Sequence, residues 1–245
     1  MHSPKCGSGN RPIAKDAALA VINALHHNHG LRPEPVIIPA AEDTAPPPAE
    51  TAVPKTQTDF SPNEDVPPLH YTVFDLETQR SAQEVGGWHR AKDMGISCAV
   101  VYDSATHTYH EYQEADIPVL VEHLHACDLV VGFNILRFDY QVLSGYSRAD
   151  LQALPSLDLL RVVHTHLGYR LSLDKLAQAT LQAEKTANGL QALKWWKEGR
   201  IREIIEYCRQ DVAVTRDLYH FGRDNGYLLF RNKARQLVRI PVQWE

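Results

Sequence analysis

The sequence predicts an α/β domain in which helices cover both faces of a mixed β-sheet. From residue 70 onward, strand-like segments alternate with helical ones, which is typical of this fold class. The first three strands follow one another through short connections, whereas helices separate the later strands. Both antiparallel and parallel neighbours are therefore expected in one sheet. The chain has 245 residues, 44% of them hydrophobic, which is enough for a sizeable core.

The predicted elements follow from the spacing of apolar residues along the chain. Strands are predicted over 70–76, 97–103 and 107–113, a helix over 116–126, a strand over 128–133 and a helix over 135–144. The next elements predicted are a strand over 157–163, helices over 173–181, 190–198 and 201–223, and extended segments at 227–231 and 236–242. His164 and His166 would then alternate along a strand with no third ligand at a known spacing, so we interpret them as ordinary residues.

Two segments precede this domain, which spans residues 70–245. Ten of the fifteen prolines lie between Arg32 and Pro68, where large apolar residues are nearly absent. Residues 31–69 are therefore predicted to be a disordered linker, because they bury too little surface to offset their ordering entropy. Residues 1–30 are predicted to be a short helical or disordered tail, because the helix expected from Ile13 to His29 has no partner element.

Composition excludes several classes of protein. No apolar stretch approaches the ~20 residues that cross a bilayer, so neither a membrane span nor a membrane partner is expected. The four cysteines have no disulfide or zinc spacing and indicate a reducing, cytoplasmic location.

The charge is unevenly distributed along the chain. Residues 70–160 carry 5 basic and 13 acidic side chains, a net charge of −8, whereas residues 161–245 carry 15 basic and 9 acidic ones, a net charge of +6. A basic flank beside an acidic site suits a phosphate chain. Basic and aromatic residues that would suit a single strand alternate at Lys194, Trp195, Trp196, Lys197, Arg200 and Arg202. Paired tryptophans in a helix are more often core residues with lysines extending around them.

A first pair of acids ends the strand predicted over 70–76. Asp75 and Glu77 are two residues apart, so both side chains point to the same face of the sheet. Two like charges at one site are unfavourable unless a cation neutralises them, and oxygen ligands select a hard ion such as Mg²⁺ or Mn²⁺. Taken alone, the pair favours an exposed acidic turn at the end of the strand over a metal site.

Two further acids lie on predicted helices. Asn134 is expected to cap the helix whose opening turns carry Asp139, close to a buried face formed by Phe138, Tyr140 and Leu143. Alone, Asp139 would pass as an acid favoured by the helix dipole.

Asp211 is the stronger candidate, because it falls within the apolar stripe of the helix from Ile201. Buried acids are rare unless they are paired or bind a metal. Tyr207 lies one helical turn earlier on the same side, so its hydroxyl can reach whatever Asp211 binds. A core tyrosine beside a salt-bridged aspartate is the alternative.

Together, Asp75, Glu77, Asp139 and Asp211 supply the carboxylates for two divalent ions about 4 Å apart. Such a pair of ions activates a water molecule and stabilises the phosphate and its leaving oxygen. The sequence therefore predicts phosphodiester hydrolysis.

The same residues resemble the DEDD superfamily of exonucleases, which have the ribonuclease-H-like fold. The three motifs are FDLET with Asp75 and Glu77, GFNILRFD with Asp139, and YCRQD with Tyr207 and Asp211. The tyrosine four residues before the last aspartate resembles the DEDDy branch. The resemblance covers residues 70–242 and implies an enzyme that removes nucleotides from a 3′ end, with Tyr207 orienting the attacking water. It also implies a structural role for Asp158.

The resemblance implies further contacts and partners. Leu76, Thr78, Phe133 and Asn134 flank the metal ligands and would wedge and hold the terminal nucleotide. More narrowly, Gly86-Gly87-Trp88, the segment 189–196 and Arg239-Ile240-Pro241-Val242 are similar to YprB-type exonucleases, which act beside a superfamily 2 helicase in bacterial DNA repair. Residues 3–10 resemble the end of the carboxyl-terminal domain of such a helicase, so the tail is expected to be a remnant of a helicase and nuclease fusion.

Two other interpretations stay open. The domain could trim RNA, as ribonuclease D relatives do, although DNA is the favoured nucleic acid. It could also be a catalytically idle ribonuclease-H-like adaptor that docks a helicase, although an adaptor has no need of five catalytic positions.

Overall fold

The computed structural model describes residues 36–37, 68–183 and 189–244. The predicted tail lies outside the described residues, as does most of the predicted linker. The described part of the linker includes β1 (Val36–Ile37), which pairs antiparallel with a strand near the carboxyl terminus.

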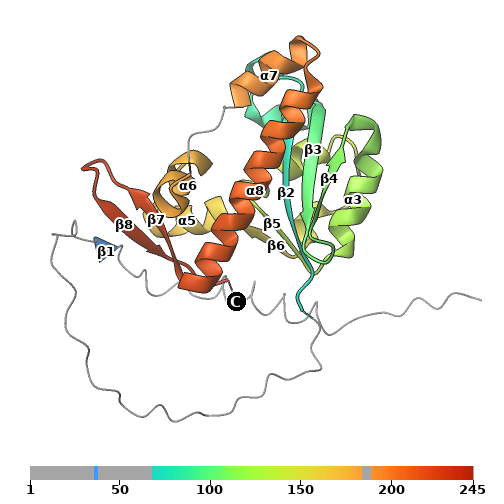
Figure 1. Ribbon diagram of the computed structural model, residues 1–245. Coiled ribbons are helices and arrows are strands. Elements are labelled where there is room, and N and C mark those ends of the chain that lie inside the picture. Colours follow the sequence, from blue (N-terminus) through green and yellow to red (C-terminus); the bar gives the residue numbers. More distant parts are fainter. Residues whose placement is uncertain (1–35, 38–67, 184–188, 245) are drawn as a thin grey trace, which may run out of the picture.

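A five-stranded mixed sheet forms the centre of the domain (Figure 1). Its strands lie in the order β4 (Thr108–Tyr112), β3 (Ile96–Asp103), β2 (Tyr71–Thr78), β5 (Leu129–Gly132) and β6 (Ser156–Asp158). The pairs β2–β3 and β3–β4 are antiparallel, whereas β2–β5 and β5–β6 are parallel. The predicted mixed sheet is therefore confirmed, and β2 lies at its centre.

Helices cover both faces of this sheet, as predicted, and each face has its own buried core. One core packs under α3 (Ile117–Ala126), α4 (Asp139–Leu143), α2 (Ala82–Val85) and the 3₁₀ helices η1 (Trp88–Asp93) and η3 (Leu151–Ala153). The other core packs under α5 (Leu159–Leu167), α6 (Leu173–Leu181), α7 (Gly189–Lys197) and α8 (Ile201–Asn225). Phe74 and Leu76 of β2 belong to the first core, and Tyr71 and Val73 to the second.

The strand predicted over 157–163 is wrong beyond Asp158. The chain turns there into α5, because the Asp158 carboxylate accepts the N–H groups of Leu160 and Arg161 and caps the helix. His164 therefore lies on an exposed helix surface rather than on a strand.

Asp158 also explains why the helix predicted over 135–144 begins late, at Asp139. Its carboxylate accepts the N–H groups of Asn134 at 2.7 Å and Leu136 at 3.2 Å, which holds the chain in a turn. Asn134 has a left-handed backbone, with φ of 72°, and does not cap α4, whose N-cap residue is Phe138. The structural role expected for Asp158 is thus visible as hydrogen bonds that join β6 to the segment after β5.

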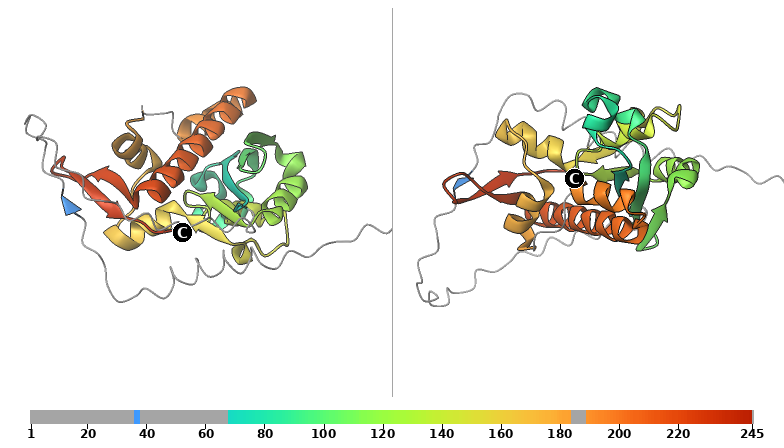
Figure 2. Two further views of the ribbon diagram at one scale, coloured as in Figure 1. Left: turned by 60° about the horizontal axis from the view of Figure 1, so that its bottom comes forward. Right: turned by 90° about the horizontal axis from the view of Figure 1, so that it is seen from above.

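The carboxyl-terminal segments form a hairpin of β7 (Tyr227–Arg231) and β8 (Leu237–Pro241). Figure 2 shows the hairpin projecting from the end of α8, away from the five-stranded sheet. The chain then returns to α8, where the Trp244 indole donates to the Tyr219 carbonyl and packs over Gly222. The long helix is therefore held at both ends, by the sheet at one and by the returning chain at the other.

The short helices between β2 and β3 have local causes that the apolar pattern does not show. Ser81 caps α2 through a capping box with Glu84, and the left-handed Gly86 ends it.

In the described residues, no helix is long and apolar enough to pass through a membrane.

Candidate active site

Strand β2 positions the first two acids. Its residues alternate strictly near the end, so that Leu76 and Thr78 are buried while Asp75 and Glu77 stay partly exposed on the α8 side. β2 pairs with β3 from Thr72 to Thr78 but with β5 only from Tyr71 to Val73, so β3 is the strand that fixes its backbone at the two acids. The sequence alternation thus places two carboxylates on a rigid central strand.

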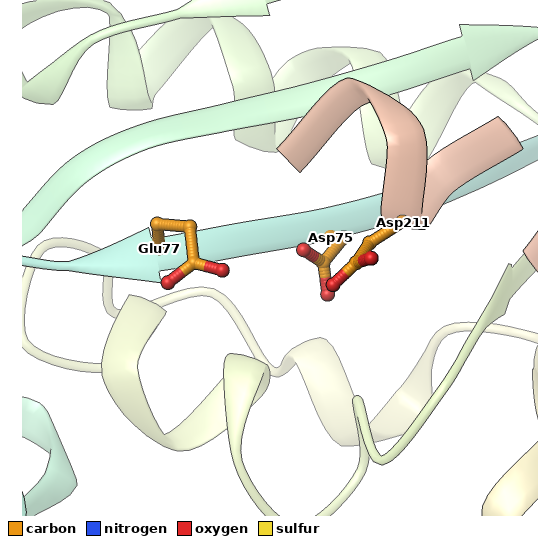
Figure 3. Close-up of side chains that lie close together, drawn as sticks. All are labelled: Asp75, Glu77 and Asp211. Carbon is orange, nitrogen blue, oxygen red and sulfur yellow. The ribbon is translucent and has the colours of Figure 1, made fainter. Parts of the chain in front are cut away.

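Helix α8 brings the third acid across the sheet. It packs on β2 and β3, and its buried side includes Ile204, Cys208 and Val212. Asp211 lies on the edge of this side, and Figure 3 shows its carboxylate beside that of Asp75, with Glu77 farther along the strand. Carboxylate oxygens of Asp75, Glu77 and Asp211 lie within 4.8 Å of one another. Residues separated by more than a hundred positions therefore meet at one place.

The fourth predicted acid, Asp139, borders this group of three without belonging to it. It is buried, with 2% of its surface exposed, and its Oδ1 accepts the backbone N–H of Leu76 at 3.3 Å. Its negative charge is nonetheless felt by Asp75, whose pKa it helps to raise. Asp139 thus lies next to the backbone of Leu76, the residue between the two acids of β2.

The acids destabilise one another's charged forms. Burial, and then the charges of Asp139, Asp211 and Glu77, raise the pKa of Asp75 well above its usual value. Burial and then the Asp211 charge do the same to the pKa of Glu77. Although both residues keep some exposed surface, desolvation is the largest cause of the raised pKa of each carboxyl group.

The pKa values of the other two acids are also raised. Burial raises the pKa of Asp139 to about 8. Burial raises the pKa of Asp211 to about 7, against a hydrogen bond from Tyr207 that lowers it. The site is therefore one that favours either protons or a cation near neutral pH.

Tyr207 lies one turn before Asp211 on α8, and its ring packs edge-on against Trp195 of α7, with 6.5 Å between ring centroids. Burial and the neighbouring carboxylates raise the pKa of its hydroxyl far above the usual value. Tyr207 therefore stays neutral and keeps a proton to donate.

The donor set fits a hard divalent cation. The three converging ligands offer only carboxylate oxygens, which suit Mg²⁺ or Mn²⁺ better than softer metals. A bound cation would also remove the mutual repulsion that raises these pKa values. Asp75, Glu77 and Asp211 are the residues that could hold it, with Asp139 beside them.

The residues predicted to hold a nucleotide lie in different environments. The Leu76 side chain is buried on the opposite face of the sheet, so contact with a nucleotide would need it to leave the core. The Thr78 hydroxyl donates to the Arg80 carbonyl at 3.1 Å. Phe133 is half-buried at the end of β5, and Asn134 beside it accepts a hydrogen bond from Arg170 at 2.7 Å.

The basic segment around α7 is largely paired with acids. Lys197 Nζ lies 2.7 Å from Glu84, and Arg200 Nε donates to Glu203 at 2.8 Å. Arg200 also lies over the Trp195 ring, 5.6 Å from its centroid. The tryptophans are half-buried, as expected for core residues with cations extending around them.

Sequence reasoning missed two thiols beneath the acids. Cys208 Sγ lies 3.4 Å from the Asp75 carbonyl oxygen and 3.5 Å from its carboxylate. Cys98 of β3 is the register partner of Glu77, and both thiols are fully buried. The spacing of apolar residues along the helix from Ile201 places Cys208 on its buried side, whereas the position of Cys98 depends on strand register, which no local pattern shows.

A comparison with known proteins places the fold. Among solved structures, the chain is similar to the family B DNA polymerase from the hyperthermophilic archaeon Pyrobaculum calidifontis, with a TM-score of 0.50 and 18% sequence identity. The match covers 64% of this chain but 25% of the polymerase chain, so this protein spans about a quarter of that length. No curated protein matches the chain. Residues 72–221 match the family model of the RNase H superfamily, and this match includes all four acids. The chain therefore belongs to the RNase H superfamily.

Proposed function

We propose that this protein is a metal-dependent 3′–5′ exonuclease that hydrolyses phosphodiester bonds of DNA. Membership of the RNase H superfamily supports a hydrolytic nuclease with nucleic acid as its substrate. The observation that carries the proposal is the meeting of Asp75, Glu77 and Asp211 within 4.8 Å, with Asp139 and Tyr207 beside them. These five residues match the DEDDy pattern in the sequence.

The four carboxylates would hold two Mg²⁺ or Mn²⁺ ions. When bound, such ions activate water and neutralise the charge that develops on the phosphate and the leaving oxygen. The protein supplies rigidity, because Asp75 and Glu77 are on a central strand and Asp211 is on a helix packed against it. Ligands held in this way need little rearrangement during the reaction.

Tyr207 would orient the attacking water. Its hydroxyl is neutral and bonds to Asp211, so it can share a water molecule with the carboxylate site. Phe133, Asn134 and the backbone of Leu76 and Thr78 would border the terminal nucleotide, because the side chains of Leu76 and Thr78 are buried.

Hydrolysis of matched DNA and RNA strands tests the proposal. Each strand carries a 3′ label and is incubated with Mg²⁺ or Mn²⁺ and either the wild type or the variants Asp75→Asn and Asp211→Asn. We expect the wild type to release labelled mononucleotides from DNA and the variants to release none. Glu122→Gln, an exposed acid on α3, is the matched control and should behave as the wild type.

The same assay separates the alternatives. Release from RNA alone would favour an RNA-trimming enzyme of the ribonuclease D type. No release from either strand would favour an adaptor and would reject the enzyme. Release in the Asp75→Asn variant equal to that of the wild type would reject this site.

A role in DNA repair beside a superfamily 2 helicase rests on the resemblance to YprB-type exonucleases. We expect the full chain to bind a helicase encoded beside its gene in a two-protein binding assay. An absence of any such helicase gene, or of binding, would reject this partner while leaving the nuclease unaffected.

A further inference from the structure

Trp88 leaves a large aromatic side chain in solvent. It is 72% exposed, whereas Ala91 in the same 3₁₀ helix η1 is 3% exposed. The other three tryptophans of the chain are half-buried or buried. Indole rings supply much of the apolar contact area in protein cores and at interfaces. The fold itself gains little of that contact from Trp88, so the ring is available to a ligand.

Hydrogen bonds fix the turn that presents Trp88. The N–H groups of Gly86 and Gly87 donate to carbonyl groups of α2, and the Gly87 carbonyl accepts the N–H of Arg90 at 3.0 Å. Gly86 and Gly87 have φ of 92° and 130°, values that residues with a side chain rarely adopt. The backbone at Trp88 is therefore arranged before any ligand arrives, which lowers the cost of binding.

The exposed ring borders the group of acids. It packs edge-on against Phe138, with 5.8 Å between ring centroids. Phe138 directly precedes Asp139, whose carboxylate accepts the backbone N–H of Leu76 between the two acids of β2. One aromatic neighbour therefore separates Trp88 from an acid of the proposed active site.

The same segment contacts α7 on its other side. Glu84 of α2 pairs with Lys197 of α7 at 2.7 Å, and Trp195 of α7 packs in turn on Tyr207. Figure 1 shows the segment between β2 and β3 beside α7, at the end of β2. The turn that carries Trp88 is therefore connected to both sides of the proposed active site and lies at its rim.

Basic side chains without acidic partners accompany the exposed ring. The acids of this segment, Glu84 and Asp93, are each paired with a basic residue. Three exposed basic residues have no ion-pair partner among the described residues, namely Arg80, Lys92 and Arg137. Lys92 belongs to the same 3₁₀ helix as Trp88, and Arg137 directly precedes Phe138. Basic side chains beside an exposed aromatic ring are the combination that binds the phosphates and bases of single-stranded nucleic acid.

We propose that Trp88 stacks on an unpaired base of the substrate strand, on the 5′ side of the terminal nucleotide, while Lys92 and Arg137 bind phosphates beside that base. This inference rests on the proposed nuclease function and adds a contact outside the metal site. A nucleic acid strand is favoured over a protein partner, because this surface adjoins the acids that would cleave the strand.

Oligothymidylates of increasing length test this contact by fluorescence anisotropy. Ca²⁺ replaces Mg²⁺ and Mn²⁺ in these measurements, so that the strands stay intact. We expect the affinity of the wild type to rise with length and to show a step where the strand reaches Trp88. Trp88→Ala should remove this step and weaken binding of longer strands about tenfold, the size of one stacked base. Trp88→Phe should weaken binding less than Trp88→Ala, because a ring remains to stack.

The variants should fold as the wild type does, since Trp88 contributes little to the core, and equal Tm values check this. Val119→Ala is the matched control, because it shortens an apolar side chain on α3 that is 57% exposed. It should bind every strand as the wild type does. Arg137→Gln should lower the slope of log Kd against log salt concentration by about 0.7, the value for one phosphate of a single strand.

The results distinguish this contact from the nuclease itself. If the wild type hydrolyses no strand in Mg²⁺ or Mn²⁺, the proposed function fails. If it hydrolyses DNA but Trp88→Ala keeps the step and binds long strands like the control, the stacking contact is rejected and the nuclease stands. A protein partner is then left as the ligand of this surface. Weakening by one factor at every length, down to the mononucleotide, would also reject the contact, because the loss would then lie in the metal site.

Discussion

Replacing Asp139 with asparagine should stabilise the metal-free protein in a manner that depends on pH. Asp139 is 2% exposed, and burial raises its pKa from 3.8 to about 8. When the pKa of an acid is higher in the folded state than in the unfolded state, the protein loses stability once the pH exceeds the pKa of the unfolded state, because the unfolded state then loses its proton more readily. Asparagine keeps an oxygen that can accept the Leu76 N–H but has no charge to bury.

The size of the effect follows from the shift in pKa. Near neutral pH this carboxyl is ionised in the unfolded state but stays protonated in the folded state, and at about 1.4 kcal/mol per pKa unit this difference lowers the stability by on the order of 4 kcal/mol. Burying the amide N–H groups of asparagine offsets about 1–3 kcal/mol of this gain. We therefore expect Asp139→Asn to raise the free energy of unfolding by about 1–3 kcal/mol at neutral pH. Near pH 4 the gain should be absent and the variant slightly less stable than the wild type, because the carboxyl in the unfolded state is then only about half ionised while the cost of burying the amide remains.

Urea unfolding in EDTA, followed by tryptophan fluorescence between about pH 4 and pH 8, measures this difference. The gain of the variant should grow by up to about 1.4 kcal/mol per pH unit and level off near pH 8. Added Mg²⁺ should reverse the order, since it stabilises the wild type by binding its folded state. A difference independent of pH would refute the argument that this carboxyl is buried against its charged form.

Three further outcomes are expected. Tyr207→Phe should lower kcat about 100-fold with little change in Mn²⁺ affinity by titration, and an equal loss of both would contradict a water-orienting role. Mn²⁺ affinity should fall as the pH drops below about 7, because protons then compete for Asp211, whose pKa is raised to about 7; a constant affinity from about pH 6 to 8 would oppose this. Gly222→Ala should lower the free energy of unfolding by about 1–3 kcal/mol, because the added Cβ would meet the Trp244 ring. Gly189→Ala, which has open space around the added Cβ, should not lower it, and equal melting temperatures of the two variants would exclude the contact with Trp244.

Much of the site could be predicted from local patterns. Strand alternation places Asp75 and Glu77 on one face, and helical spacing aligns Tyr207 with Asp211. These relations depend on neighbours within a few residues, which a sequence displays directly. The sequence predicts that Asp139 meets the other acids, and the structure places it beside them, with its carboxylate accepting the backbone N–H of Leu76.

Other features depend on contacts that no local pattern contains. The apolar run at Leu157, Leu159 and Leu160 suggests a strand, but Asp158 captures N–H groups from two segments and starts a helix instead. The pairing of Glu77 with Cys98 and of Thr78 with Ile96 requires a shift in register between β2 and β3. Such features appear only when the pairing of strands and the packing of helices are known.

The two buried thiols next to the acids can be used as a chemical probe of local opening motions. Cys98 and Cys208 are 0% exposed, and Cys208 contacts Asp75 across the junction between α8 and the sheet. An alkylating reagent can reach them only when that helix lifts, so its labelling rate reports how often the catalytic framework opens. Ions that tie Asp211 to β2 would slow this labelling, which makes cation occupancy readable without any nucleic acid present.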